Sequence, residues 1–123
     1  KNFFVYSESP QLAKDLVKNS WCSAEPEVNE NGEELISRMT FNVDGTSEVE
    51  EILTSNDKVH MRGKGKWEAD ENTLTWIVPG TDKRMEFEAV IDKTKDPVEL
   101  VTKFKGQSGD DKDYEETVRI PCE

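Results

Sequence analysis

Apolar and polar residues alternate along most of the chain after position 20, and this period of two is typical of β-strands. One parity is mostly apolar in the stretches 35–41, 85–91, 98–104 and 114–122. The stretch 73–78 carries apolar residues on both parities, so we expect it to be buried on both sides. In the last stretch, the apolar parity contains Tyr114, Val118, Ile120 and Cys122, which predicts that these side chains face the interior.

Turn-forming residues separate these stretches at short intervals and predict tight connections between neighbouring strands. Asp44-Gly45 is a strong hairpin signal. The breaks give about eight strands with no helical pattern between them, and about eight strands is the size at which a sheet closes around a small interior. We therefore predict a mainly β fold, an eight-stranded antiparallel up-and-down β-barrel. The breaks lie at 29–32, 43–45, 55–57, 70–72, 79–82, 95–97 and 106–113.

The first twenty residues follow a different pattern. Leu12 and Leu16 fall at helical spacing, and Ser9-Pro10 ahead of them is a typical helix start. The sequence therefore predicts one short amphipathic helix whose apolar stripe rests on another part of the fold, preceded by a loose arm. We divide the chain into this arm and helix, at 1–20, and a barrel at 21–123.

The chain is strongly acidic, because its 123 residues include 16 Lys and Arg against 27 Asp and Glu, a net charge of −11. Such a surface repels phosphate backbones and anionic head groups, which counts against nucleic-acid binding and a peripheral-membrane role. No run approaches the roughly 18 apolar residues of a membrane span. We interpret the charge as favouring solubility, with a cationic partner or calcium as the alternative. For the acidic segment 110–116, a solvated loop is the preferred interpretation and calcium the alternative.

The two cysteines, Cys22 and Cys122, lie near the two ends of the predicted barrel. A disulfide would have a single possible connectivity and would join the first strand to the last. In the chain-entropy model, a bond that closes a loop of about 100 residues contributes roughly 4–5 kcal/mol. We expect this bond and, with it, an oxidising compartment, either periplasmic or extracellular. Two free thiols in a cytosolic protein are the alternative.

Three segments resemble those of the lipocalin-like (calycin) β-barrels, in particular a small bacterial member. A short helix leads into a tryptophan at 16–21, and a Phe-x-x-Asp-Gly-Thr run lies at 41–46. A Gly-x-Trp that ends in a turn before a leucine strand spans 65–74. The resemblance covers most of the chain. It implies a barrel with a central cavity, often for apolar small molecules, in a family that also includes proteins without a known ligand.

The chain departs from the family pattern at its first strand. Lipocalins carry Gly-x-Trp there, whereas this chain has Asn19-Ser20-Trp21 and places its Gly65-Lys66-Trp67 in mid-chain. The family also places an arginine near the last strand, packed over the first-strand tryptophan, and Arg119 is the positional match. The alternative is that Arg119 is an outward-facing strand residue.

We find no catalytic constellation and do not expect an enzyme. His60 is the single histidine, and we interpret it as a surface residue rather than a zinc ligand or catalytic base. Gly63-Lys64-Gly65-Lys66 lacks the pattern of a phosphate loop, and its glycines are predicted to mark a bulge or a tight bend. Trp67 and Trp76 are predicted core residues that bracket a hairpin, with a sugar platform as the alternative.

The first functional hypothesis is a non-enzymatic protein that carries a small apolar ligand in the barrel. Because most of the inward side chains are large, a barrel filled by them is the competing outcome. The second hypothesis is an interaction module, such as a protease inhibitor or a cell-envelope accessory protein, with residues 1–9 as the contact segment. We expect a monomer without a cofactor, and a lipid anchor on a removed N-terminal segment is a further alternative. The expected lining is Met39, Phe41, Val49, Met61, Trp76, Phe87, Leu100, Phe104 and Val118.

Overall fold

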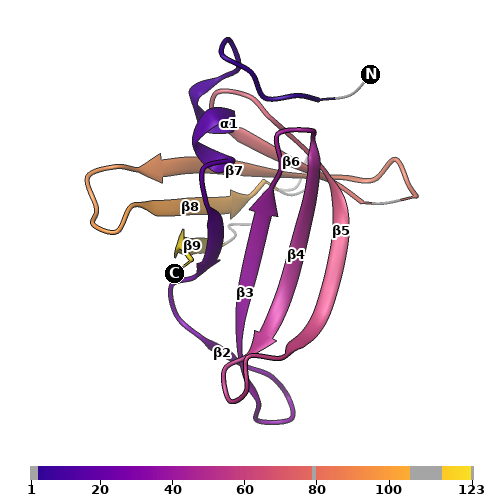
Figure 1. Ribbon diagram of the computed structural model, residues 1–123, viewed down its shortest axis with the longest axis vertical. Coiled ribbons are helices and arrows are strands. Elements are labelled where there is room, and N and C mark those ends of the chain that lie inside the picture. Colours follow the sequence, from indigo (N-terminus) through magenta and orange to yellow (C-terminus); the bar gives the residue numbers. More distant parts are fainter. Residues whose placement is uncertain (1–2, 79, 106–114, 123) are drawn as a thin grey trace.

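The computed structural model describes residues 3–78, 80–105 and 115–122, which form one short helix and a set of antiparallel strands (Figure 1). Most strands follow one another along the chain through short turns, as the alternation predicts. The elements are α1 (Gln11–Leu16), β1 (Ser20–Ser23), β2 (Glu27–Val28), β3 (Glu34–Phe41), β4 (Thr46–Leu53), β5 (Val59–Ala69), β6 (Thr73–Ile77), β7 (Arg84–Asp92), β8 (Glu99–Phe104) and β9 (Glu116–Pro121).

The strands close into a barrel because β1 pairs on one side with β9 and on the other with β3. Trp21 lies opposite Pro121 in one ladder and opposite Met39 in the other. The closed ring contains eight antiparallel strands among the described residues, which confirms the predicted barrel. The short β2 stands outside the ring and pairs with β3. The closed barrel is consistent with a calycin-like fold.

The β3–β4 hairpin shows how local sequence sets the connections. Gly45 has a φ of 86°, a left-handed conformation that a residue with a side chain rarely adopts. The side chain of Asp44 accepts a hydrogen bond from the backbone N–H of Thr46 at 3.0 Å. Addition of a Cβ at Gly45 would bring it to 2.5 Å from the carbonyl oxygen of Phe3. The Asp-Gly pair therefore forms the predicted hairpin and also admits the N-terminal arm.

A disulfide joins Cys22 to Cys122, with Cα atoms 5.1 Å apart, and so connects the first ring strand to the residue after the last. The bond is as predicted, but its orientation is not. Trp21 is buried in the interior, so its neighbour Cys22 faces outward, where it lies opposite Arg38. The parity predicted for the last strand was wrong for the same reason, since Pro121 rather than Ile120 lies opposite Trp21.

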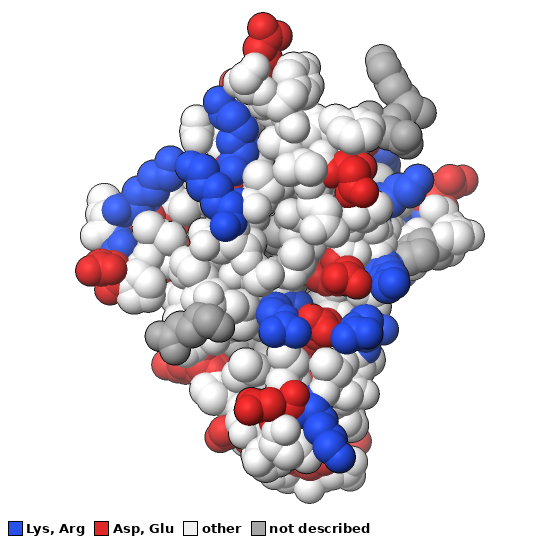
Figure 2. Space-filling view, viewed as in Figure 1, with Lys and Arg blue, Asp and Glu red and all other residues white. Residues whose placement is uncertain are grey.

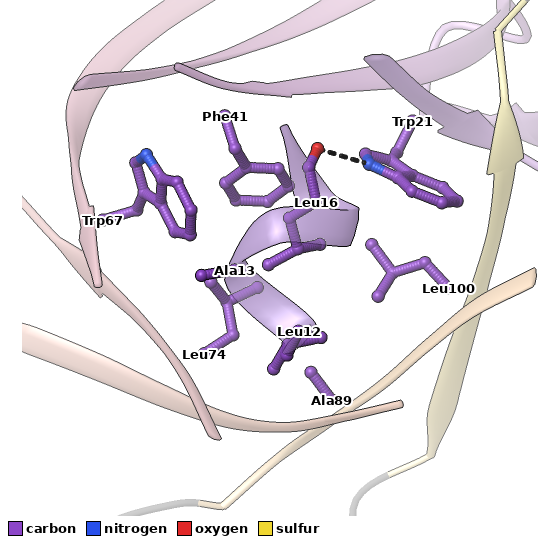
Figure 3. Packing of buried hydrophobic residues seen from close by; sticks show 9 residues of the cluster. All are labelled: Leu12, Ala13, Leu16, Trp21, Phe41, Trp67, Leu74, Ala89 and Leu100. Carbon is purple, nitrogen blue, oxygen red and sulfur yellow. Dashed lines mark hydrogen bonds between the residues drawn. The ribbon is translucent and has the colours of Figure 1, made fainter. Parts of the chain in front are cut away.

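The helix α1 enters one end of the barrel and supplies much of the core (Figure 3). Leu16 and Ala13 are fully buried, and strand side chains surround them. The indole N–H of Trp21 donates to the carbonyl oxygen of Leu16 at 3.0 Å, which satisfies a carbonyl in the last turn of the helix. The core cluster consists of Leu12, Ala13, Leu16, Trp21, Phe41, Trp67, Leu74, Ala89 and Leu100.

The N-terminal arm packs against the same end of the barrel, where the sequence predicted a loose segment. The Val5 N–H donates to the carbonyl oxygen of Val43 at 2.9 Å. The ring of Phe3 lies 4.9 Å from that of Trp67 in an edge-on arrangement. Ser9 does not cap the helix with its side chain; its hydroxyl instead accepts a hydrogen bond from the Tyr6 N–H at 2.9 Å. The arm is therefore ordered, and it helps to close the end of the barrel that α1 enters; we call this end the closed end.

A row of charges crosses the outer face of β3, β4 and β5 and is visible in Figure 2 as a blue, red and blue band. The Glu50 carboxylate accepts hydrogen bonds from Arg38 at 2.7 Å and from Arg62 at 2.9 Å. The Glu50 side chain is 9% exposed, yet both carboxylate oxygens are paired. Hydrogen bonds from Arg62 and then Arg38 lower the pKa of Glu50. These ion pairs link β3, β4 and β5 on the outer face of the barrel.

Candidate functional site

A cavity of about 340 Å³ occupies the barrel interior next to the packed core. On β3, β6, β7 and β8, a cavity side chain lies two positions from a residue of the core cluster. Examples are Met39 beside Phe41 and Phe87 beside Ala89. The same inward parity therefore forms a filled layer around α1 and an open layer beyond it. The cavity is lined by Met39, Val49, Leu74, Trp76, Met85, Phe87, Thr102, Phe104, Glu115, Thr117 and Arg119.

Five of the nine residues expected to line the barrel meet at this cavity. They come from five different strands, and the rings of two of them lie 5.4 Å apart, those of Phe87 and Phe104. The five are Met39, Val49, Trp76, Phe87 and Phe104.

The other four lie elsewhere. Phe41 and Leu100 are 2% and 0% exposed in the core cluster, because α1 fills the barrel at their level. Met61 is 50% exposed near the start of β5 and borders a neighbouring depression. Val118 borders the same depression, and its strand partner is Val101. Since the buried Leu100 and Thr102 flank Val101, Val118 faces outward rather than into the barrel.

Sequence reasoning did not select six of the lining residues. Leu74 and Met85 share strand parity with Trp76 and Phe87, which were expected to line the barrel. The alternation therefore already predicted that Leu74 and Met85 face inward. Thr102 and Thr117 lie directly opposite each other on β8 and β9. They were not expected in the lining because they are polar and the expected lining residues were apolar. The six are Leu74, Met85, Thr102, Glu115, Thr117 and Arg119.

The cavity has room on the β5 side because this strand presents glycines there. An added Cβ at Gly65 would lie 2.9 Å from the Cε2 atom of the Trp76 indole. An added Cβ at Gly63 would lie 3.3 Å from a methyl carbon of Val49. Both glycines sit in regular register with β4, and the irregularity lies between Glu51 and Ile52. The predicted bulge at the glycines is therefore wrong, and they provide close approach for lining side chains.

Arg119 is the one lysine or arginine among the described residues that line the cavity. It lies opposite the buried Leu100 on β8, so it points inward. Its Nε atom is buried and has no hydrogen-bond partner. Burial lowers the pKa of the Arg119 guanidinium, and attraction to Glu27 acts in the opposite direction. The alternative of an outward-facing residue is therefore wrong. Among the described residues, the ring contacts join only aromatic side chains, and they include no stacking contact between Arg119 and Trp21.

The cavity adjoins a wider depression at the barrel mouth, and the two share Val49, Glu115, Thr117 and Arg119. The depression has a volume of about 810 Å³. Its border is acidic, so a molecule that approaches the cavity from this side meets negative charge first. The acidic residues are Glu25, Glu27, Glu51, Glu99, Glu115 and Glu116, and we call this set the acidic mouth.

The remaining candidate sites from the sequence analysis receive less structural support than the cavity does. His60 is exposed on β5. Residues 110–114 of the acidic segment considered for calcium, and Tyr114 of the last predicted strand, lie outside the described residues. In the described ranges, no group of three or more His, Cys, Asp or Glu side chains is placed to hold a metal ion. Trp67 is fully buried, so it is unavailable as a sugar platform.

No helix in the described part of the chain has the length and apolar character needed to cross a membrane. A comparison with known proteins found no matching family model, no matching curated protein and no matching solved structure.

Proposed function

We propose that the chain is a lipocalin-like, non-enzymatic binding protein that holds a small apolar ligand in the barrel cavity. The observation that carries this proposal is an apolar cavity of about 340 Å³ left open beside a fully packed core. Ligand sites in proteins span roughly 300–1,000 Å³, so this cavity suits a small ligand.

The chemistry of the lining supports the same proposal. Trp76, Phe87 and Phe104 supply aromatic surface, and Met39 and Met85 supply flexible thioether chains. Methionine adapts its shape to a bound molecule more readily than a branched side chain does. Each buried methylene of a ligand contributes about 0.8 kcal/mol, so a chain of about ten carbons has roughly 8 kcal/mol available before the cost of association.

We propose an extracytoplasmic location for this activity, and the Cys22–Cys122 disulfide supports it. Disulfides persist in oxidising compartments and are rare in the cytosol. Closure of the barrel by a bond of this kind suits a binding protein that works outside the reducing cytosol.

Titration with Nile red, an uncharged apolar dye, tests the proposal. We expect a saturable rise in dye fluorescence with one site per chain. The variant Thr117→Trp carries a large ring at the mouth of the cavity, and we expect it to bind the dye with at least about tenfold lower affinity. Thr75→Trp is the matched control, because Thr75 lies between inward Leu74 and Trp76 and faces out. Unsaturable binding, or equal affinity in both variants, would reject the cavity as a ligand site.

A second candidate function, a protein-contact surface at the closed end, has one observation in its favour. Phe4, Tyr6 and Val43 are 55%, 61% and 54% exposed on the arm and the adjoining hairpin. Deletion of the arm is a poor test, because Phe3 packs on Trp67 and its loss would disturb the core. The double variant Phe4→Ser, Tyr6→Ser leaves Phe3 in place, and unchanged partner capture by it would exclude this surface.

A further inference from the structure

The first half of β5 has an open side. Lys66 lies opposite Ile77, the last residue of β6, and in the described ranges no strand pairs with β5 on that side at lower positions. Val59 and positions 61–65 pair with β4 on the other side. In Figure 1, β5 continues alongside β4 well past its contact with β6. A strand edge of this kind can accept a further strand.

The backbone groups on the open side belong to Arg62 and Lys64. The Trp67 N–H donates to the carbonyl oxygen of Gly45 in the β3–β4 turn, so the backbone of Trp67 faces β4. Successive residues of a strand direct their N–H and C=O groups to alternate sides. The odd-numbered residues from 61 to 67 therefore face β4, and Arg62 and Lys64 direct their N–H and C=O groups to the open side.

The outer side chains along this edge are basic. Arg62, Lys64 and Lys66 alternate along the outer face of β5 and are exposed. Among the described residues, Lys64 and Lys66 form no ion pair. Met61, which is 50% exposed, and Gly63 share the inward parity and leave an apolar surface there. A strand that matched this edge would carry acidic residues on its outer parity and apolar residues on its inner parity. The strand already paired with β5 shows what matches these side chains. Glu48 of β4 lies opposite Lys64. Glu50 lies opposite Arg62 and pairs with it at 2.9 Å. Val49, between the two glutamates, lies on the inward parity and lines the cavity. A segment with the pattern Glu-apolar-Glu is therefore compatible with one side of β5, and the other side presents the same basic residues.

We propose that the open side of β5, at positions 61–65, binds an extended acidic segment of a partner protein by strand addition. The segment would alternate acidic and apolar residues, with its backbone bonded to Arg62 and Lys64 and its carboxylates beside Lys64 and Lys66. A second copy of this edge is a poor occupant, because it would place like charges opposite each other. The chain has a net charge of −11, but physiological salt screens charges beyond about 8 Å, so the adjacent basic side chains decide. The inference does not depend on a ligand in the cavity.

A synthetic peptide that copies residues 46–53 of β4, with both ends blocked, tests the proposal by NMR on labelled protein. We expect saturable binding. In the free protein, the N–H groups of Arg62 and Lys64 should exchange rapidly with solvent, and those of Gly63 and Gly65, which face β4, should exchange slowly. Saturation with the peptide should slow exchange at Arg62 and Lys64 about tenfold or more. Only a strand added on the open side protects these two positions selectively.

Two further peptides separate strand addition from charge attraction. A peptide with Glu48→Lys and Glu50→Lys should bind about tenfold more weakly or worse, because its charges repel those of β5. A peptide that keeps both glutamates but carries a methyl group on their backbone nitrogens should also bind about tenfold more weakly, because it cannot donate hydrogen bonds to β5.

Two exposed lysines supply matched variants of the protein. Lys64→Glu places a negative charge beside the open edge and should weaken binding of the original peptide about tenfold. Lys95→Glu makes the same change in net charge between β7 and β8, away from β5, and should alter the affinity less than about twofold. Slow exchange of the Gly63 N–H in both variants would show that β5 still pairs with β4.

Several results would overturn the proposal. One is the absence of saturable peptide binding, and another is binding that leaves exchange at Arg62 and Lys64 unchanged. Equal affinity for the methylated peptide, or equal effects of Lys64→Glu and Lys95→Glu, would reduce the interaction to general charge attraction and reject strand addition. If the two N–H groups become protected without peptide as the protein concentration rises, a second copy occupies the edge and the acidic partner is rejected.

Discussion

At the end of the barrel that α1 enters, Leu16 and Trp67 are fully buried, whereas Met39 and Phe87, two positions along the strands from core residues, face an open cavity. Strands β3, β6, β7 and β8 contribute side chains of the same inward parity to both layers. The helix α1 fills the centre of the closed layer, and the Trp21 indole donates a hydrogen bond to it (Figure 3). The N-terminal arm adds Phe3, whose ring packs against that of Trp67. No described element fills the centre of the other layer.

The difference teaches that the strand pattern alone does not decide whether a small barrel is packed or hollow. An eight-stranded barrel is near the size at which its own side chains fill it. In this chain, glycines at 63 and 65 remove side chains from one wall, and α1 is too short to reach further. Close packing is therefore concentrated at one end of the barrel and open volume at the other.

The largest expected effect comes from removal of the disulfide, which joins a core strand to the strand that carries Arg119. In the chain-entropy model, the double variant Cys22→Ser, Cys122→Ser should lose about 4–5 kcal/mol of unfolding free energy, since the bond closes a loop of 100 residues. Urea denaturation measures this loss. A loss below about 1 kcal/mol would show that the barrel is closed by its ladders and that sulfur adds little.

The next prediction compares the loss of unfolding free energy caused by one substitution in each layer. Leu16→Ala opens space in a fully packed region and should cost about 2–5 kcal/mol of unfolding free energy. Met39→Ala enlarges an existing cavity, so we expect a loss below about 2 kcal/mol together with altered Nile red affinity. The two variants, measured in the same denaturation series, test the contrast. Equal losses would mean that the cavity region is packed as tightly as the helix end.

The smallest effect concerns the outer row of charges on β3, β4 and β5. Glu50→Gln should lower the unfolding free energy by about 1–2 kcal/mol at neutral pH, a moderate value because both arginines are partly exposed. Hydrogen bonds from Arg62 and Arg38 lower the pKa of Glu50 below its ordinary 4.5. The contribution is therefore complete above pH 4.5 and is lost as the pH falls through the lowered folded-state pKa. Denaturation of both proteins from pH 7 to pH 3 should show the difference shrinking; a constant difference would contradict it.

Much of the fold followed from the sequence because alternation and turns are local signals. The Asp44-Gly45 hairpin, the strand count and the Cys22–Cys122 pairing needed only composition and spacing. The ordered arm did not follow, because its position depends on contact between Phe3 and Trp67, which lie far apart in the sequence. Long-range packing of this kind leaves no local periodicity.

Only part of the candidate site could be predicted from the sequence, for two physical reasons. Parity selects inward residues but not their level along the barrel axis, so Phe41 and Leu100 were grouped with Met39 and Phe87. In the last strand, hydrophobicity favoured Val118 over its neighbour, although the ladder with β8 turns Arg119 inward. A buried charge contradicts the ordinary pattern of apolar inside and polar outside, so that pattern misplaces a residue such as Arg119.

The length of β5 has a consequence for self-association. Among the described residues, β5 pairs with β6 through positions 66–69, while Val59 and positions 61–65 pair with β4 alone. A long strand with one free side is a template onto which a second molecule can add. Here that template carries Arg62 and Lys64 and is interrupted by two glycines, features that discourage a flat intermolecular ladder. These residues should therefore disfavour edge-to-edge association along the part of β5 that pairs on one side only.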